Sequence, residues 1–384
     1  MTANQIYSII NEVAQQSFGS KAISVVDLTS LIAMGDTVLS SSSNKEEFLN
    51  TLVDRIGKTI IGTRNYSPQT QNLIIDEMQF GAVIQKTYVE PFDANENTSH
   101  DVTDGTDVNL FIVAKPSVTQ KLFSVKDTWQ FEVTVPDYQM NTAFTSSESM
   151  ASFINSIYVT LENSLNISLE NMVNMTIANF LAEKIADSKA TTPTGVNAIN
   201  LLSEYNTTFS PSTTLTVAKA LQDKDFLRFA TTQIKLIMSR LQRMSELYNM
   251  EGYKRFTPKD KMHVLMLTDF VASVNAYLES DTYHNELVAL PNYNEVSYWQ
   301  GLGTDGEFTN TSAINIETSN GVALNYTGIL GVIFDEDAMG VMVQRRNALS
   351  DHSNKYEVTH TWQRCDYGYF NDLSENGVVF FIED

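Results

Sequence analysis

The segment from Glu148 to Ser188 contains neither glycine nor proline. Its apolar residues recur at steps of three and four, which predicts a helix with one continuous apolar face. The apolar positions are Met150, Ile154, Ile157, Leu161, Leu165, Leu169, Met172, Val173, Ile177, Phe180 and Leu181. At a rise of 1.5 Å per residue, this helix would be about 60 Å long. The fold of this chain must therefore accommodate one very long rod.

The opposite face of this predicted helix is polar but almost uncharged. Between Asn163 and Ala182 the segment carries one charged residue, Glu170, and five asparagines. Asparagine is a mediocre helix former that surface helices seldom favour. The composition of this face therefore needs an explanation beyond simple solvation.

Composition limits the class of protein. A chain of 384 residues is long for one compact unit, so two or three lobes are expected. The net charge of −21 argues against a general role in gripping nucleic acid and against docking on anionic membranes. The single cysteine excludes an internal disulfide, in keeping with a reducing cytoplasm. The chain shows no basic signal-peptide region and no apolar run of the roughly 18 residues that a membrane span needs. A soluble intracellular product is therefore expected.

Short helices are predicted near the N-terminus. Periodicity indicates a helix over residues 4–18, stopped by Gly19, and a second helix after Asp27. Ser43, followed by Glu46 three residues later, predicts a capping box at the start of a third helix.

Strands and helices are mixed in the rest of the chain. Residues 80–90 and 128–137 are rich in Val, Thr, Phe and Tyr, which is typical of strands. The acidic, Asn-rich residues 93–107 between them predict an exposed tip that only an adjacent copy of the chain would order. A helix is predicted over about 215–250, and a buried strand over 261–268 leads into another helix. The C-terminal part alternates as strands do, with a turn at SENG before the last apolar strand.

One glycine motif matches the dinucleotide-binding pattern without its context. GLGTDG contains Gly301, Gly303 and Gly306 in the required positions. A dinucleotide-binding site presents the N-terminus of a helix to a pyrophosphate, but the residues that follow GLGTDG do not predict a helix. Asp305 would also repel phosphate. We interpret the motif as a glycine turn between strands.

Two further patterns lack the ligands that a metal ion needs. DEDAMG resembles the start of a calcium loop, but Met339 and Arg346 occupy the fifth and twelfth positions, where oxygen ligands belong. His352, His360 and Cys365 are too widely spaced for a zinc site, which usually contains closely spaced pairs. We therefore expect no catalytic, cofactor-binding or metal-binding residues, and no enzyme activity.

One basic region interrupts this acidic chain. Positions 235 to 261 contain seven basic and three acidic residues, which gives a net charge of +4. The basic residues are Lys235, Arg240, Arg243, Lys254, Arg255, Lys259 and Lys261, and the acidic ones are Glu246, Glu251 and Asp260. This basic island is either a solvated helix face or a contact surface for acidic parts of a neighbouring copy.

The order of these elements resembles that of the major capsid proteins of tailed bacteriophages, whose fold is of the Hong Kong 97 type. The resemblance is specific in VTVPDYQMNTAFTSSESMASFINSIYVTLENSL and in the closing TGILGVIFDEDAMGVMVQRRNA and GYFNDLSENGVVFFI. It implies an α+β fold in five parts. These are an N-terminal arm (1–75), an extended two-stranded hairpin with flanking strands (76–147), a peripheral domain with the long spine helix (148–192), an axial domain (193–327) and the return to the peripheral domain through C-terminal strands (328–384).

The resemblance also implies a function. The chain would self-assemble into pentamers and hexamers of an icosahedral capsid around a double-stranded DNA genome, which it would hold without sequence-specific binding. Assembly would occur in the bacterial host cytoplasm, with a separate scaffolding protein, a portal protein and decoration proteins as partners and no membrane. The uncharged polar face of the spine would lie under neighbouring subunits, because interface interiors are depleted in charge.

Two alternatives stay open. An encapsulin-like nanocompartment shell would share the fold but would carry an enzyme cargo and lack a portal. An enzyme without a recognisable motif is the third possibility. Some capsid proteins of this type join their subunits by a Lys–Asn isopeptide bond, and Lys115, Lys121 and Lys126 lie in the predicted hairpin. No motif around these lysines matches, so no cross-link between subunits is assigned.

Overall fold

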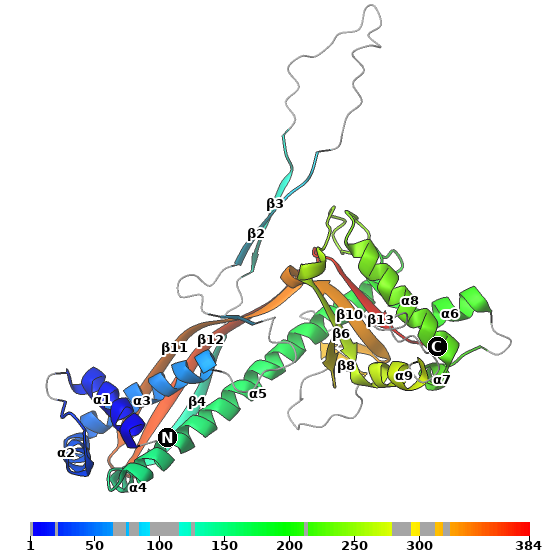
Figure 1. Cartoon of the computed structure of the whole chain (residues 1–384). Coiled ribbons are helices and arrows are strands. Elements are labelled where there is room, and N and C mark those ends of the chain that lie inside the picture. The colour runs from blue at the N-terminus through cyan, green and yellow to red at the C-terminus, as the bar shows by residue number, and fades with distance from the viewer. Residues whose placement is uncertain are drawn as a thin grey trace, which may run out of the picture. The chain divides into compact units, whose positions relative to one another are not determined.

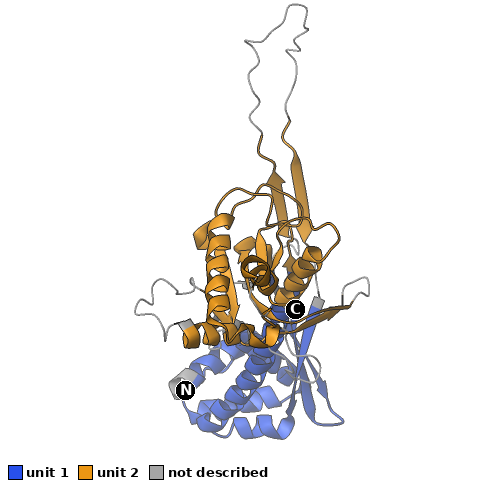
Figure 2. Ribbon diagram, turned by 90° about the vertical axis from the view of Figure 1, so that its right-hand side faces the viewer, with its two compact units in different colours: residues 1–82, 125–175, 340–369 blue, residues 83–124, 176–339, 370–384 orange. Residues whose placement is uncertain are grey.

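The structure is a computed structural model of the chain. It describes residues 3–19, 22–63, 74–76, 84–92, 115–123, 127–210, 214–278, 293–299, 312–317 and 323–384. The acidic segment 93–107 and the GLGTDG motif lie outside these residues. The chain forms two compact units, each built from segments far apart in the sequence (Figure 2). Unit 1 comprises residues 1–82, 125–175 and 340–369, and unit 2 comprises residues 83–124, 176–339 and 370–384.

Unit 1 begins with the helices α1 (Ala3–Phe18), α2 (Leu28–Leu39) and α3 (Ser42–Thr63) (Figure 1). Gly19 ends α1 as predicted and has a φ of 54°, which glycine adopts without steric cost. Asp27 precedes α2 as predicted, and its carboxylate accepts a hydrogen bond from the backbone N–H of Ser30. Asp27 and Ser30 cap each other reciprocally, so this helix start is encoded locally.

The predicted capping box of α3 is wrong. The helix begins at Ser42, two residues before the start that a cap at Ser43 would give, and the hydroxyl of Ser41 accepts a hydrogen bond from the N–H of Asn44 at 3.2 Å. Ser43 therefore lies inside the first turn. The carboxylate of Glu46 instead accepts the N–H of His352 at 3.0 Å. Glu46 therefore bonds to a residue far along the chain instead of capping its own helix.

A four-stranded sheet completes unit 1, in the order β1–β11–β12–β4. Its strands are β1 (Ile74–Asp76), β11 (Met339–Ser353), β12 (Val358–Asn371) and β4 (Asp127–Pro136). β1 runs parallel to β11, and β4 runs antiparallel to β12. The hydrophobic core of unit 1 joins the three N-terminal helices, α4 (Asp137–Ala143) and the first half of the long helix α5.

The long helix is confirmed as α5 (Ser147–Ser188) (Figure 1). Every apolar position predicted for its inner face is buried. Three other apolar side chains on it, Val159, Ile167 and Met175, are 43%, 53% and 47% exposed. In the described part of the chain, no helix is both long enough and apolar enough to cross a membrane.

Unit 2 is organised around a five-stranded sheet in the order β5–β13–β10–β6–β7. The strands are β5 (Ala198–Asn200), β13 (Gly377–Phe381), β10 (Ile329–Asp335), β6 (Met262–Leu267) and β7 (Asn294–Val296). Every residue of β10 and β13 is buried, so these strands read as continuous apolar runs instead of alternating. The predicted strand over 261–268 is confirmed as β6, which leads into α9 (Thr268–Leu278).

The remaining elements of unit 2 include one correction. The predicted helix over 215–250 is two helices, α7 (Val217–Ala220) and α8 (Lys224–Leu241), which follow α6 (Leu201–Phe209). Asp223 caps α8, and the carbonyl of Leu241 accepts the N–H of Thr257 at 2.8 Å. Residues 242–256 thus form a loop that folds back on itself through a Ser245–Arg255 bridge. A small hairpin pairs β8 (Ile314–Glu317) with β9 (Ala323–Tyr326).

Candidate functional site

The most distinctive feature of unit 2 is a separate two-stranded hairpin. It pairs β2 (Ile84–Val89) with β3 (Val118–Phe123) in antiparallel register (Figure 1). The sequence pattern missed β3. The predicted strand over 128–137 is β4, and it pairs with β12 and not with the hairpin. Strand pairing depends on long-range register, which local alternation alone does not determine.

The two faces of the hairpin differ. Along both strands, exposure alternates from residue to residue, as expected for a ribbon covered on one face only. The outer face presents Val89, Val118 and Leu122, which are 53%, 55% and 63% exposed. The inner face places Lys86 directly opposite Lys121. Like charges directly opposite each other destabilise a strand pair, so this arrangement needs a counter-charge.

Asp372, which directly follows β12, supplies that counter-charge. Its two carboxylate oxygens lie 3.3 Å from the Nζ of Lys86 and 3.1 Å from the Nζ of Lys121. The Asp372 side chain is 1% exposed, and it also accepts hydrogen bonds from the N–H and the hydroxyl of Ser374. Burial alone would raise the pKa of Asp372, but the Ser374 hydrogen bond and the two lysines lower it below its usual value. This carboxylate bridges both strands of the hairpin at its base.

Further charges complete this group. Glu375 lies 2.8 Å from Arg255 and 3.8 Å from Lys86, and Glu251 pairs with Lys121. Burial alone would lower the pKa of Lys121, but Glu251 and Asp372 raise it. We call the six residues Lys86, Lys121, Glu251, Arg255, Asp372 and Glu375 the hairpin clasp. The clasp balances three cations with three carboxylates.

Aromatic side chains pack beside the hairpin clasp. The ring of Tyr88 on β2 stacks on Tyr253 with centroids 4.5 Å apart, and the Arg255 guanidinium lies 4.8 Å from the Tyr88 centroid. On β3, Phe123 packs against Phe370 at 5.3 Å. Cation–π and ring contacts of this kind add stability where charges are shielded from water. Both ionic and aromatic contacts therefore attach the base of the hairpin to the rest of unit 2.

The pKa of Glu375 predicts a pH dependence of stability. Burial raises this pKa from 4.5 to about 7, against the opposing effect of Arg255 and Lys86. Between pH 4.5 and about pH 7, Glu375 therefore carries a proton in the folded chain that it has lost in the unfolded chain. Glu375 thus stabilises the fold most below about pH 4.5, and this contribution is lost as the pH rises to about 7. At about 1.4 kcal/mol per pKa unit, the whole effect is about 3 kcal/mol.

Replacing this carboxyl by an amide tests that dependence. Glu375→Gln no longer titrates, so its melting temperature relative to the parent should rise between about pH 5 and about pH 8. Thermal unfolding of the isolated subunit followed by circular dichroism measures the difference. A difference that stays constant over this range would show that Glu375 titrates near its usual pKa.

The residues singled out in the sequence are dispersed. In DEDAMG, the Asp335 carboxylate accepts the N–H of Asp337 in a short turn between β10 and β11. His352 contacts the hydroxyl of Thr359, whereas His360 contacts Glu132 and stacks on Trp362. Cys365 is buried against Leu169. Among the residues that the structure describes, no group of three or more His, Cys, Asp or Glu could hold a metal ion.

The basic island separates into two parts. Arg255 belongs to the hairpin clasp, and the Nζ of Lys254 lies 4.0 Å from Glu246, so both have partners inside the chain. Arg255 therefore finds an acidic partner within its own chain. Arg240, in the last turn of α8, and Arg243, just after that helix, are exposed. Of the three lysines in the predicted hairpin, Lys121 is in the clasp, Lys115 is exposed and Lys126 lies outside the described residues.

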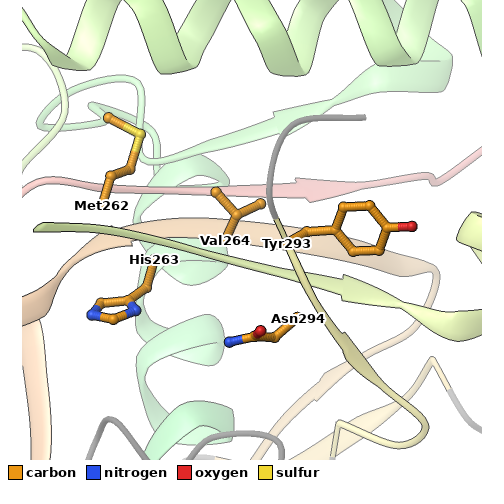
Figure 3. Close-up of a pocket in the computed structure, with 5 residues that line it drawn as sticks. All are labelled: Met262, His263, Val264, Tyr293 and Asn294. Carbon is orange, nitrogen blue, oxygen red and sulfur yellow. The ribbon is translucent and has the colours of Figure 1, made fainter. Parts of the chain in front are cut away.

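Unit 2 also contains a cleft of about 340 Å³, beside the strands β6 and β7 (Figure 3). Met262, His263, Val264, Tyr293 and Asn294 line it. The His263 ring stacks on Phe334, and Figure 3 shows the Tyr293 ring directed away from His263. Among the described residues that line this cleft, none carries a carboxylate, a thiol or an aliphatic hydroxyl.

Comparison with known proteins places this architecture among phage capsids. The family model of Phi29-like phage major capsid proteins matches residues 7–381. A chain in the capsid structure of Staphylococcus phage Andhra is 9% identical, with a TM-score of 0.53 over 84% of this chain and 88% of that chain. A chain in the structure of the head fiber and inner core protein gp22 of native bacteriophage P68 is 9% identical, with a TM-score of 0.54 over 83% of this chain and 85% of that one. No curated protein sequence matches this chain.

Proposed function

This chain belongs to the family of Phi29-like phage major capsid proteins, and we propose that it forms the hexamers and pentamers of an icosahedral shell around double-stranded DNA. It is a structural protein of the phage capsid, and its α+β fold is the Hong Kong 97 type predicted from the sequence. The family match favours the phage capsid over the nanocompartment shell.

The hairpin is the observation that best supports assembly through neighbouring copies. An isolated two-stranded hairpin is marginal in water unless another surface covers it. Here the clasp covers the inner face, while the exposed outer face presents Val89, Val118 and Leu122 together with Gln85, Thr87 and Gln120. Burial of that face on a neighbouring subunit would stabilise both the hairpin and the shell.

The finer assignments follow from this proposal. In the shell, the proposed division has five parts. These are the arm (1–75), the extended hairpin with flanking strands (76–147), the peripheral domain with the spine helix (148–192), the axial domain (193–327) and the return to the peripheral domain (328–384). A separate scaffolding protein and a portal protein would direct assembly in the host cytoplasm, and decoration proteins would bind the finished shell. The net charge of −21 suits a container that holds DNA without gripping it. No enzymatic step is assigned to the chain.

Assembly can be tested directly. The chain would be expressed alone and together with the products of neighbouring genes, purified, and viewed by negative-stain electron microscopy. Closed shells of uniform diameter, in either preparation, are expected. Shells that retain a host enzyme as cargo would instead favour a nanocompartment, and the absence of regular particles from both preparations would contradict the proposal.

The exposed part of the basic island predicts a salt-dependent defect. Arg240→Glu combined with Arg243→Glu should weaken assembly at low salt while leaving the fold intact, because the two exposed arginines would no longer attract acidic neighbours. Exposed ion pairs contribute up to about 1 kcal/mol each, and every subunit repeats the loss. Shell yield at two salt concentrations measures the effect. The control is Lys219→Glu, which reverses an exposed charge on α7 outside the island. Normal assembly of the double variant would show that the island is a solvated face.

A further inference from the structure

Unit 2 buries a lysine that has no carboxylate at hydrogen-bond distance among the residues that the structure describes. Lys184, near the end of α5, is 0% exposed. Its Nζ donates to the side-chain oxygen Oδ1 of Asn197 at 2.8 Å and to the carbonyl of Tyr248 at 3.3 Å. The ring of Phe180 lies 5.5 Å from the same nitrogen. A buried ammonium held only by neutral acceptors costs several kcal/mol, so the neutral amine is favoured here.

The asparagine beside this lysine is held firmly. Asn197 is 0% exposed and directly precedes β5, the edge strand of the five-stranded sheet. Its backbone carbonyl accepts a hydrogen bond from the N–H of Val379 at 3.0 Å. Its side-chain nitrogen Nδ2 donates to the carboxylate of Asp187 at 2.7 Å. The carboxamide is therefore oriented between an amine on one side and a carboxylate on the other.

From these three side chains we propose that Lys184 and Asn197 react to form an isopeptide bond within the folded chain, with Asp187 as the proton relay. Because an amide C=O bond is about 1.2 Å long, the Nζ of Lys184 lies within about 4 Å of the Cγ of Asn197, close to the distance of a near-attack conformer. The two side chains belong to one chain and are buried, so this bond differs from a cross-link between subunits.

The reaction balances without an oxidant or a cofactor. The lone pair of the Lys184 amine attacks Cγ, a new C–N bond forms, and the bond between Cγ and Nδ2 breaks. The attack places Nζ and Nδ2 on the same carbon, beside the Asp187 carboxylate that accepts a hydrogen bond from Nδ2 at 2.7 Å. In this intermediate Asp187 accepts the proton released by the amine and donates it to Nδ2, which leaves as ammonia. The carboxylate of Asp187 is positioned for this by hydrogen bonds from the N–H of Thr194 at 3.3 Å and the hydroxyl of Thr194 at 3.0 Å.

The charges around Lys184 agree with this chemistry. Burial lowers the pKa of the amine from 10.5 to about 7, although Asp187 on the same helix and Asp372 in the hairpin clasp both oppose that change. A substantial fraction of the amine is therefore neutral and nucleophilic at neutral pH. The product would also fasten the end of α5 to the sheet by a covalent bond, which restricts the unfolded chain and so stabilises the fold.

Mass spectrometry of the denatured full chain tests the proposal. The parent protein should be lighter than its sequence by one ammonia, and a protease digest should contain one branched peptide that joins positions 184 and 197. Loss of ammonia without that peptide would indicate cyclisation of an asparagine and would overturn the proposal. The full sequence mass, in the isolated subunit and in shells, would overturn it as well.

Three variants separate the roles. Lys184→Met removes the nucleophile, and Asn197→Ser removes the leaving group, so both should show their full mass. Asp187→Asn keeps both reacting groups but removes the relay, and its unlinked fraction should rise from almost none to most of the protein. An equally complete link in Asp187→Asn would show that this residue is not the relay.

Discussion

A proline at position 168 is expected to abolish closed shells. Ser168 lies in the interior of α5, where proline removes one backbone donor and clashes with the carbonyl four residues earlier. The cost is about 3 kcal/mol or more, and the helix bends. A bend of about 20° displaces the end of the remaining 30 Å of helix by roughly 10 Å. A shell cannot absorb this error, because every subunit must fit several neighbours and each copy repeats it.

The matched control for this variant is Ser168→Ala. It keeps the rod straight and improves the helix propensity by a few tenths of a kcal/mol, so normal shells are expected. Both variants would be co-expressed with the neighbouring gene products and examined by electron microscopy, with circular dichroism to verify that the subunits fold. Regular closed particles from Ser168→Pro would contradict the role of α5 as the spine of the subunit.

Loss of the Asp372 charge is expected to release the hairpin from its clasp. Asp372→Asn leaves Lys86 and Lys121 opposite each other with no carboxylate between them. Removing one partner from a buried ion pair costs about 3–5 kcal/mol, and the partial exposure of both lysines brings the expected loss to about 3 kcal/mol. Chemical denaturation of the isolated subunit measures this loss. Shell formation should fail as well, because the hairpin loses its fixed direction.

Restoring the charge balance provides the control. Adding Lys86→Met to Asp372→Asn leaves two cations and two carboxylates in the clasp, so much of the lost stability should return. Glu251→Gln removes a carboxylate whose side chain is 36% exposed, so a loss below about 1 kcal/mol is expected. If the double variant is no more stable than Asp372→Asn alone, repulsion between the two lysines is not what Asp372 prevents.

Local patterns in the sequence determined the elements whose contacts are close along the chain. The periodicity over 148–188 predicted α5 and its buried face, because helix neighbours lie three and four residues apart. Asp27 and Gly19 marked helix ends, since capping is also local. The order of these elements was enough to indicate the capsid fold, which the family match confirms.

Only the tertiary structure decided which distant residues meet. β3 was missed and α8 was predicted too long, because strand register and the Thr257–Leu241 hydrogen bond depend on contacts beyond the local window. The same holds for the candidate sites. Asp372 follows Lys121 by 251 positions. Arg255 resembles a surface charge in the sequence, but in the fold it contacts Glu375 and Tyr88. Lys184 and Asn197 are close in sequence, yet nothing local shows that both are buried. Burial turns a common lysine into a candidate nucleophile, and burial is a property of the whole fold.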